Sequence, residues 1–297
     1  MSQIGTLVRS IRLRFLILTP ICILLGWSFA IANQSQAPAY VWLLSLFGAL
    51  LAHIGVNTLN EYADFKSGLD LRTKRTQFSG GSGALPDNPQ MAQWVLILAI
   101  ISLFIAGLIG VVFIMQYGWG LLPIALLGLV LIIGYTPWIN QHPLLCLIAP
   151  GMGFGVLMVL GANFVLTGGY SLPVVVASLV PFLLINNLLL LNQYPDVEAD
   201  QAAGRYHFPI AYGAKASAWM YLGFVLLSLL LIVVSVLVGI LPVATLIALL
   251  GLLPAFHAFS GMRKYQLEIA KHPQYLKSNV LAAVLTPLLL ALAIIWS

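Results

Sequence analysis

Charged residues are scarce in this chain of 297 residues, in which Asp, Glu, Lys and Arg together make up 7%. Soluble domains carry roughly a quarter of their residues as charges, so a water-soluble globular fold is excluded. Hydrophobic residues make up 61% of the chain. The apolar runs are ~20 residues long, the length of a membrane-spanning helix. They are continuous, whereas the strands of a membrane β-barrel alternate. We therefore predict an all-α, polytopic membrane protein.

Cysteine is also rare, because only Cys22 and Cys146 are present and neither has a metal-binding or redox spacing. We interpret both as packing residues. The net charge is +5, which in a soluble protein would suggest nucleic acid. In a membrane protein it indicates instead contact with the lipid of the cytoplasmic leaflet and an anionic ligand, so no nucleic-acid partner is expected.

Hydropathy predicts nine spanning helices around a central cavity that is open to the cytoplasmic side. Their approximate limits are residues 13–32, 40–62, 92–115, 119–138, 144–166, 172–193, 217–238, 241–259 and 278–297. With these limits all 13 Lys and Arg residues fall on one side of the membrane. The positive-inside rule makes that side cytoplasmic, so we expect an inner-membrane protein with a cytoplasmic N-terminus. Residues 30–32 resemble a signal-peptide cleavage site, but the preceding apolar run is too long, which favours an uncleaved first helix.

The few acidic residues are concentrated in two stretches, residues 57–70 and 192–200, which hold six of the eight Asp and Glu residues. The stretches end the second and sixth predicted helices, so both lie on the cytoplasmic side. Their similarity and their spacing of four helices suggest a single domain, residues 1–297, made of two four-helix halves (13–138 and 144–259) and a ninth helix (278–297).

Helical spacing places the polar residues of each stretch on one face. Residues three or four apart are neighbours on a helix, which groups Asn57, Asn60, Glu61 and Asp64, and separately Asn192, Asp196 and Asp200. Two carboxylates ~4 Å apart repel by about 4 kcal/mol at an effective dielectric constant near 20, so a cation is needed. Carboxylate and carboxamide oxygens suit Mg²⁺. We predict as metal ligands Asn60, Glu61, Asp64, Asp196 and Asp200.

Basic and glycine-rich segments beside the acidic stretches suit a phosphate. Lys66 and Arg72 follow the first stretch and Arg205 follows the second, and we predict that they contact a diphosphate. Backbone amides of residues 77–83 could surround an anion. Asn57 and Asn192 are expected to help bind this substrate. A polar, Mg²⁺-dependent mouth above an apolar interior describes a site for a lipid diphosphate.

With these motifs the chain resembles the UbiA superfamily of intramembrane prenyltransferases. That family has nine helices and two aspartate-rich motifs, Asn-Asp-x-x-Asp-x-x-x-Asp and Asp-x-x-x-Asp, after the second and sixth helices. Asn60, Glu61 and Asp64 match the first motif with Glu for its first Asp, and Asp196 and Asp200 match the second in full. The resemblance covers the whole predicted topology.

Departures from the basic pattern point to one branch of the family. Gly68 replaces the last Asp of the first motif and Asp70 follows two residues later. This form resembles the menaquinone branch, the 1,4-dihydroxy-2-naphthoate prenyltransferases, as does the sequence around Tyr135. The benzoate branch usually carries a Lys-Arg pair shortly after this tyrosine, and residues 138–141 lack it. The acceptor expected from the resemblance is an aromatic quinone precursor.

The resemblance implies that Mg²⁺ and basic groups stabilise a departing pyrophosphate, leaving an allylic cation that an aromatic acceptor attacks. Tyr135 is our candidate for stabilising that cation, and Asp64, Asp196 and Asp200 are the expected catalytic carboxylates. Two alternatives remain open at this point. A terpene cyclase of the same architecture would use no acceptor, and a cation transporter would use the carboxylates without chemistry. The sequence predicts neither the prenyl chain length nor the oligomeric state.

Overall fold

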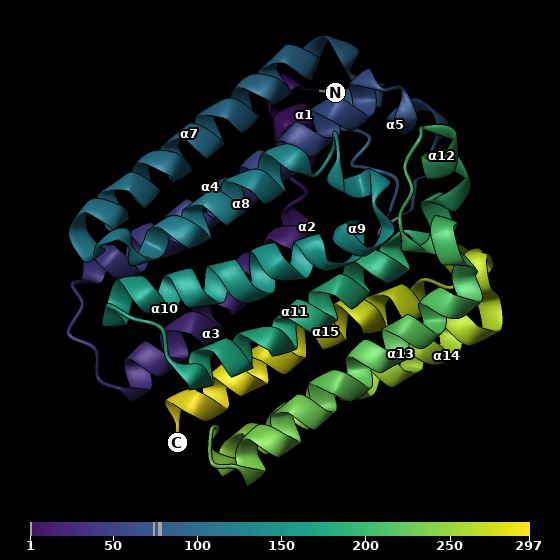
Figure 1. The fold of residues 1–297 in the computed structure, drawn as a ribbon. Helices are drawn as coiled ribbons and strands as arrows, with labels where there is room; N and C mark the ends of the chain where they lie inside the picture. Colours follow the sequence, from purple (N-terminus) through teal and green to yellow (C-terminus); the bar gives the residue numbers. More distant parts are fainter. Residues whose placement is uncertain (1, 74, 77–78) are drawn as a thin grey trace.

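The computed structural model describes residues 2–73, 75–76 and 79–297, which form helices and turns without a β-strand. Long helices lie side by side, and the N-terminus and C-terminus lie at opposite ends of the bundle (Figure 1). The all-helical prediction is confirmed for the part of the chain that is described.

The helices fall into two sets that meet at the turn around residue 142. The first set consists of α1 (Gln3–Ser10), α2 (Leu13–Leu16), α3 (Leu18–Ala32), α4 (Ala39–Lys66), α5 (Leu69–Arg72), α6 (Ala84–Asp87), η1 (Pro89–Met91), α7 (Ala92–Tyr117), η2 (Trp119–Leu121), α8 (Leu122–Gly134) and η3 (Ile139–Gln141). The second consists of α9 (Pro143–Pro150), the π-helix η4 (Gly151–Met158), α10 (Val159–Thr167), α11 (Leu172–Asn192), η5 (Tyr194–Asp196), α12 (Val197–Ala202), α13 (Phe208–Leu237), η6 (Val243–Leu252), α14 (Leu253–Tyr265), η7 (Gln266–Lys271) and α15 (Pro273–Ile295).

Seven helical segments of the described chain are long and apolar enough to cross a membrane. Gln3–Leu16 and Leu18–Ala32 together form a bent eighth, and Trp119–Gly134 is a shorter apolar segment. The chain thus has the helices of a polytopic membrane protein. The count of nine spans and the two related halves stay predictions.

The first predicted span, residues 13–32, is wrong as a single straight helix. The chain breaks at Ile17, and the segments on either side are bent by 41°. Pro20 explains the position of the break, because it has no amide hydrogen to bond the carbonyl of Leu16 and its ring crowds that carbonyl. A second break lies at Arg12, which has a left-handed backbone with φ of 56°.

The sixth span forms the centre of the bundle. In Leu172–Ala202, 72% of the most apolar window is buried inside the protein, compared with 17% in Pro89–Tyr117. A buried core of α3, α10, α11, η6 and α15 surrounds it. Because α7 buries so little, its apolar side chains face outward, as expected of a helix in lipid.

The π-helix η4 packs tightly against α11. A side chain at Gly151 or Gly155 would meet the backbone of Phe182 at 2.2 Å, so these glycines allow the close approach. The amide of Gly151 donates to Oδ1 of Asn186 at 2.7 Å, which satisfies one backbone group in this irregular turn. The prediction that this glycine-rich run serves close helix packing is confirmed.

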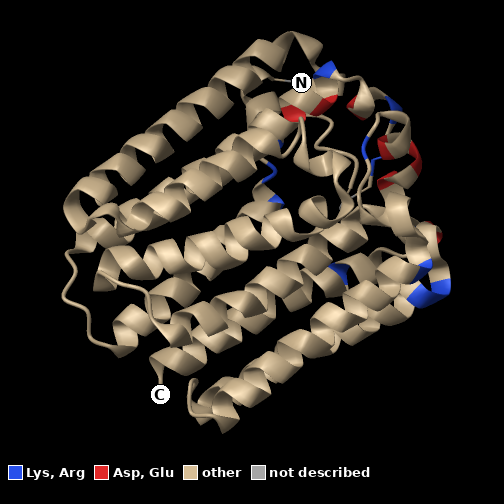
Figure 2. Ribbon diagram, viewed as in Figure 1, with Lys and Arg blue, Asp and Glu red and all other residues tan. Residues whose placement is uncertain are grey.

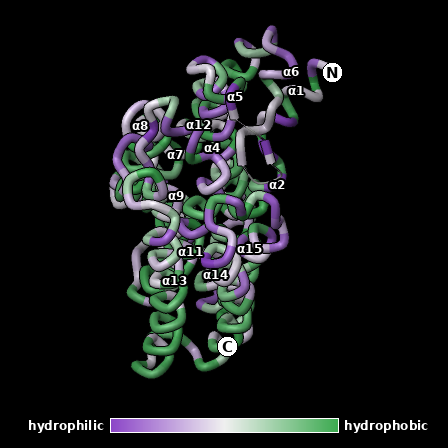
Figure 3. Tube along the Cα trace, turned by 90° about the vertical axis from the view of Figure 1, so that its right-hand side faces the viewer, coloured by the Kyte–Doolittle hydropathy of each residue, from purple (hydrophilic) through white to green (hydrophobic). Residues whose placement is uncertain are grey.

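Polar and charged residues gather at one end of the bundle. Figure 2 shows the acidic segments together at the end that carries the N-terminus, and none at the end that carries the C-terminus. Figure 3 shows hydrophilic residues concentrated around α5, α6 and α12, while the opposite end is mostly hydrophobic. The two acidic stretches are therefore brought to the same end, as predicted. Which side of the membrane this end faces stays a prediction.

Candidate active site

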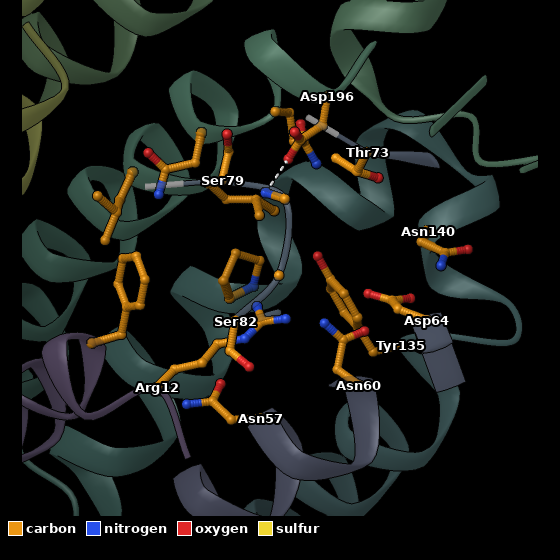
Figure 4. Close-up of a pocket in the computed structure, with 18 of the residues that line it drawn as sticks. Arg12, Asn57, Asn60, Asp64, Thr73, Ser79, Ser82, Tyr135, Asn140 and Asp196 are labelled. Atoms are coloured by element: carbon orange, nitrogen blue, oxygen red, sulfur yellow. Dashed lines mark hydrogen bonds between the residues drawn. The ribbon is translucent and has the colours of Figure 1, made fainter. Parts of the chain in front are cut away.

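A cavity of about 600 Å³ lies where the two acidic stretches meet. Its walls come from the N-terminal segment, α4, α9, η4, α11, α12 and the loop at residues 79–82. Figure 4 shows that Asn60, Asp64 and Tyr135 point into the same space, with Asp196 and Ser79 across from them. This is the volume of a small-molecule site.

The first acidic stretch lies on α4 as the spacing predicts. The helix continues to Lys66, four residues beyond the predicted end, so Asp64 is still helical. Asn57, Asn60 and Asp64 all line the cavity. Asn57 donates to the carbonyl of Ile11 at 2.9 Å, and Asn60 accepts from the Thr136 hydroxyl at 3.2 Å. These contacts hold both carboxamides at the cavity wall.

The second acidic stretch reaches the same cavity by a different geometry from the predicted helical face. α11 ends at Asn192, and a 3₁₀ turn carries Asp196 before α12 carries Asp200. Pro195 has no amide hydrogen with which to continue the α-helical bonding, which explains the break. Asn192, Asp196 and Asp200 nevertheless all line the cavity.

Arg205 bridges the two acidic stretches. Its Nη2 donates to Oδ1 of Asp64 and its Nη1 donates to Oδ1 of Asp200 at 3.1 Å. Although burial lowers it, the facing carboxylates of Asp64 and Asp200 raise the pKa of Arg205 above its ordinary value. His207 approaches the other oxygen of Asp200, with Nε2 3.0 Å away. One guanidinium thus offsets the repulsion of two carboxylates.

The glycine-rich loop contacts both acidic stretches. The amide of Gly80 donates to Oδ2 of Asp196 at 2.9 Å, and the amide of Ser82 donates to Oε2 of Glu61 at 3.1 Å. Arg9 donates to the carbonyl of Ser82 at 2.8 Å and so ties the loop to α1. Residues 77 and 78 of the predicted anion-binding segment lie outside the described residues. The loop amides that are described therefore bond carboxylates of this chain.

Glu61 lies apart from the other predicted metal ligands. Its side chain is fully buried and does not line the cavity. Nη2 of Arg12 donates to its Oε2 at 2.9 Å, and the Ser82 hydroxyl donates to Oε1. Both carboxylate oxygens already have partners in this arrangement, which instead anchors the N-terminal segment and the loop to α4.

The basic residues at the cavity differ from two of the three predicted. Arg205 lines it, but Lys66 and Arg72 do not. Lys66 lies 5.7 Å from the ring centroid of Tyr62. The N-terminal residues Arg9, Arg12 and Arg14 line the cavity instead. No spacing could reveal them, because Arg12 meets Glu61 across 49 positions of sequence.

Tyr135 lies at the cavity wall just after α8. Its hydroxyl is 3.8 Å from Sγ of Cys146, a weak contact that leaves the ring face to line the space. Cys146 is buried, as predicted for a packing residue, and also receives a hydrogen bond from Gln193.

Several oxygen atoms at the cavity are buried without a hydrogen-bond partner among the described residues. They are Oδ2 of Asp70, Oδ1 of Asn192 and Oδ1 of Asp196. Buried acceptors of this kind are costly unless a ligand or ion satisfies them. They are also the oxygen ligands that Mg²⁺ accepts. The donor set therefore fits a hard divalent cation. In the described part of the chain no three acidic, His or Cys side chains form a ready-made metal cluster. The carboxylates of Asp64 and Asp200 are instead held by Arg205.

Asp70, whose displaced position distinguishes the first motif, is part of this set. It is 3% exposed and lines the cavity. Burial, together with the charges of Glu61 and Asp64, raises the pKa of Asp70 from 3.8 to about 7. A carboxyl with a raised pKa is poised to release its proton to a bound cation.

Comparison with known proteins identifies the family. A model of the UbiA prenyltransferase family matches residues 19–279. The chain belongs to the UbiA prenyltransferase family. This confirms the resemblance found in the two aspartate-rich motifs.

Two curated relatives are 1,4-dihydroxy-2-naphthoate octaprenyltransferases. That of Bacillus subtilis (strain 168) is 30% identical over 186 residues, which cover 60% of this chain and 56% of that protein. That of Haemophilus influenzae is 25% identical over 189 residues, which cover 62% of this chain and 61% of that protein. The chain therefore spans less than two thirds of the length of these UbiA relatives.

Solved structures share the fold over the whole chain. A digeranylgeranylglyceryl phosphate synthase has a TM-score of 0.70 at 18% identity, covering 100% of both chains. A UbiA homolog from Archaeoglobus fulgidus bound to DMAPP and Mg²⁺ has a TM-score of 0.69 at 15% identity, covering 98% of this chain and 99% of that one. At these identities the likeness establishes the UbiA fold.

The ion pair of Arg12 and Glu61 yields a stability prediction. Replacing Arg12 with Ala leaves a fully buried carboxylate without its cation, and we expect a loss of about 3 kcal/mol in unfolding free energy. Adding Glu61→Gln removes the unpaired charge, so most of the loss should be recovered. Unfolding in detergent micelles measures both. Arg14→Ala is the control, because Arg14 is exposed and forms no ion pair with any described residue. Equal stability of the Arg12→Ala and Arg14→Ala proteins would contradict the assignment.

The pKa of Asp70 yields a prediction about pH. Its folded-state value of about 7 exceeds the ordinary 3.8, so ionised Asp70 destabilises the fold increasingly as pH rises from about 4 to 7. In a metal chelator, Asp70→Asn should therefore stabilise the protein more at pH 8 than at pH 5. Asp87→Asn is the opposite control, because the hydrogen bond from Arg9 lowers the pKa of Asp87. Its loss should destabilise the protein equally at both pH values. A pH-independent effect of Asp70→Asn in thermal melts would refute the prediction.

Proposed function

We propose that this protein transfers a prenyl group from a prenyl diphosphate to an aromatic quinone precursor within the membrane, and releases pyrophosphate. The observation that carries the proposal is the convergence of both aspartate-rich stretches on one cavity of a UbiA-family chain. That cavity is polar at the carboxylates and apolar beyond them, which matches a substrate with a diphosphate head and a hydrocarbon tail.

The mouth of the cavity would hold the diphosphate. Asp64, Asp196 and Asp200 are the carboxylates that would bind Mg²⁺, with Asn60 and Asp70 beside them. The unpartnered oxygens of Asp70 and Asp196 support this assignment. When bound, the ion would neutralise charge on the departing pyrophosphate. Arg205 lies between the carboxylates and would contact the diphosphate, as would Arg12 from the opposite wall.

The reaction requires the bond between the allylic carbon and the diphosphate oxygen to break, with both electrons leaving on oxygen. The ring of Tyr135 would face the allylic cation that remains, because aromatic faces stabilise cations by about 2 kcal/mol when water is absent. A ring carbon of the acceptor then forms the new bond and loses its proton. The apolar inner wall would protect the cation from water.

The acceptor class is supported by the relatives rather than by a bound ligand. Both curated relatives are named for 1,4-dihydroxy-2-naphthoate, and Gly68 with Asp70 resembles that branch. Menaquinone biosynthesis would be the process served. The clustering of Lys and Arg at the end that carries the cavity supports a cytoplasmic active site with the N-terminus on the same side (Figure 2).

A product assay tests the proposal. Purified protein is incubated with Mg²⁺ and a series of prenyl diphosphates, with and without 1,4-dihydroxy-2-naphthoate, and the products are analysed by mass spectrometry. We expect a prenylated naphthoquinol and pyrophosphate, and a loss of both in excess chelator. Pyrophosphate release with a cyclic hydrocarbon and no need for acceptor would support a terpene cyclase instead. No pyrophosphate release with any donor would refute both enzymes and leave the transporter.

Substitution of the carboxylates tests the site. Asp64→Asn and Asp196→Asn should each lower turnover at least about 100-fold, because each removes a charge that holds the ion against the leaving group. Glu198→Gln is the matched control, since Glu198 lies in the same stretch but is exposed and does not line the cavity. Melting temperatures check that all three variants fold. Near-normal activity of either aspartate variant would contradict the metal-site assignment.

A further inference from the structure

The polar stripe on α4 continues one turn deeper than the acidic motif. His53 lies four residues before Asn57, so it shares the face that carries Asn57, Asn60 and Asp64, and all four line the cavity. At 1.5 Å per residue, His53 lies about 16 Å along the helix from Asp64. The cavity walls at this depth are otherwise apolar, with Phe15, Leu18, Phe154, Ile185 and Leu188.

His53 is held in one orientation. Its Nδ1 lies 2.8 Å from the hydroxyl oxygen of Thr19, which is itself fully buried. Its ring meets the ring of Phe154 edge to face, with centroids 4.5 Å apart and planes at 68°. Because Thr19 occupies Nδ1, Nε2 is the ring atom left for a ligand, and it has no hydrogen-bond partner among the described residues. A histidine that only filled space would gain nothing from an unpaired nitrogen beside a cavity.

The cavity therefore has two chemically different walls. One is the stripe of α4, which presents His53 and Asn57. The other comes from α11 and η4 and is apolar. A prenyl tail matches the apolar wall. An aromatic acceptor with a polar substituent matches the stripe, with the ring of Phe154 at its inner end.

We propose that His53, oriented by Thr19, binds a phenolic hydroxyl of the aromatic acceptor at the deep end of the cavity. The inference rests on the proposed function and names the acceptor subsite. For reaction, a ring carbon of the acceptor lies about 3–3.5 Å from the allylic carbon near the mouth. A hydroxyl on the far side of the acceptor then faces His53. A hydroxyl can either donate to Nε2 or accept from it, so the match holds for both tautomers of the imidazole.

Steady-state kinetics with 1,4-dihydroxy-2-naphthoate and geranyl diphosphate test this subsite. Loss of a hydrogen bond that leaves a polar group unpaired corresponds to a factor of about 5–100. His53→Leu should raise KM for the naphthoate by about that factor and leave KM for the diphosphate unchanged. His53→Gln, which keeps a polar atom, should restore part of the affinity. Thr19→Val should raise the same KM by a smaller factor, because Thr19 acts through His53.

Ser45→Ala provides the control on the same helix. Ser45 is buried and hydrogen-bonded to Trp27, and it does not line the cavity, so both KM values should stay unchanged. An unchanged naphthoate KM in His53→Leu, or a parallel rise in both KM values, would overturn the subsite. If His53→Leu does not fold, the same outcomes are read from His53→Gln and Thr19→Val. Absence of transfer by the unsubstituted protein would refute the proposed function instead, so the two failures are distinguishable.

Discussion

The candidate site depends on the repulsion between carboxylates that two distant parts of the chain bring together. Asp64 ends one long helix, and Asp200 follows another. In this structure Arg205 binds both, and the pair can coexist because the guanidinium offsets their charge. The same constraint explains why the neighbouring oxygens of Asp70 and Asp196 are left for an ion. An arginine that bridges two ligand carboxylates also lies where a diphosphate must sit, so cation and substrate would compete for and share its charge.

Interruptions of the helices shape the cavity. The left-handed backbone at Arg12 turns the N-terminal segment over the opening, and Pro195 redirects the chain so that Asp196 faces inward. The π-helix that follows Pro150 places Phe154 at the inner wall. Irregular backbone is tolerated inside a membrane protein only where it is buried or lines a cavity. Each of these breaks satisfies that condition.

Much of this arrangement follows from the sequence. Long apolar runs predict the helices, and a spacing of three and four residues places Asn57, Asn60 and Asp64 on one face because helical geometry is local. Other features depend on contacts between distant residues. Glu61 shares the predicted face but turns to Arg12 and Ser82, whose approach no local rule describes. Lys66 and Arg72 were expected at the anion because they follow the motif, whereas the N-terminal arginines reach the cavity through a bend. His53 continues the α4 stripe and could have been identified by extending the same spacing by one turn.

The account rests on the claim that the two acidic stretches form one site. Calorimetric titration with Mg²⁺ and an unreactive prenyl diphosphate analogue tests this directly in Asp64→Asn, Asp196→Asn and the double variant. If the carboxylates hold one ion-bound diphosphate, the losses in binding free energy are strongly non-additive, and the double variant binds no more weakly than the worse single variant. Fully additive losses would mean two independent sites and would contradict the account.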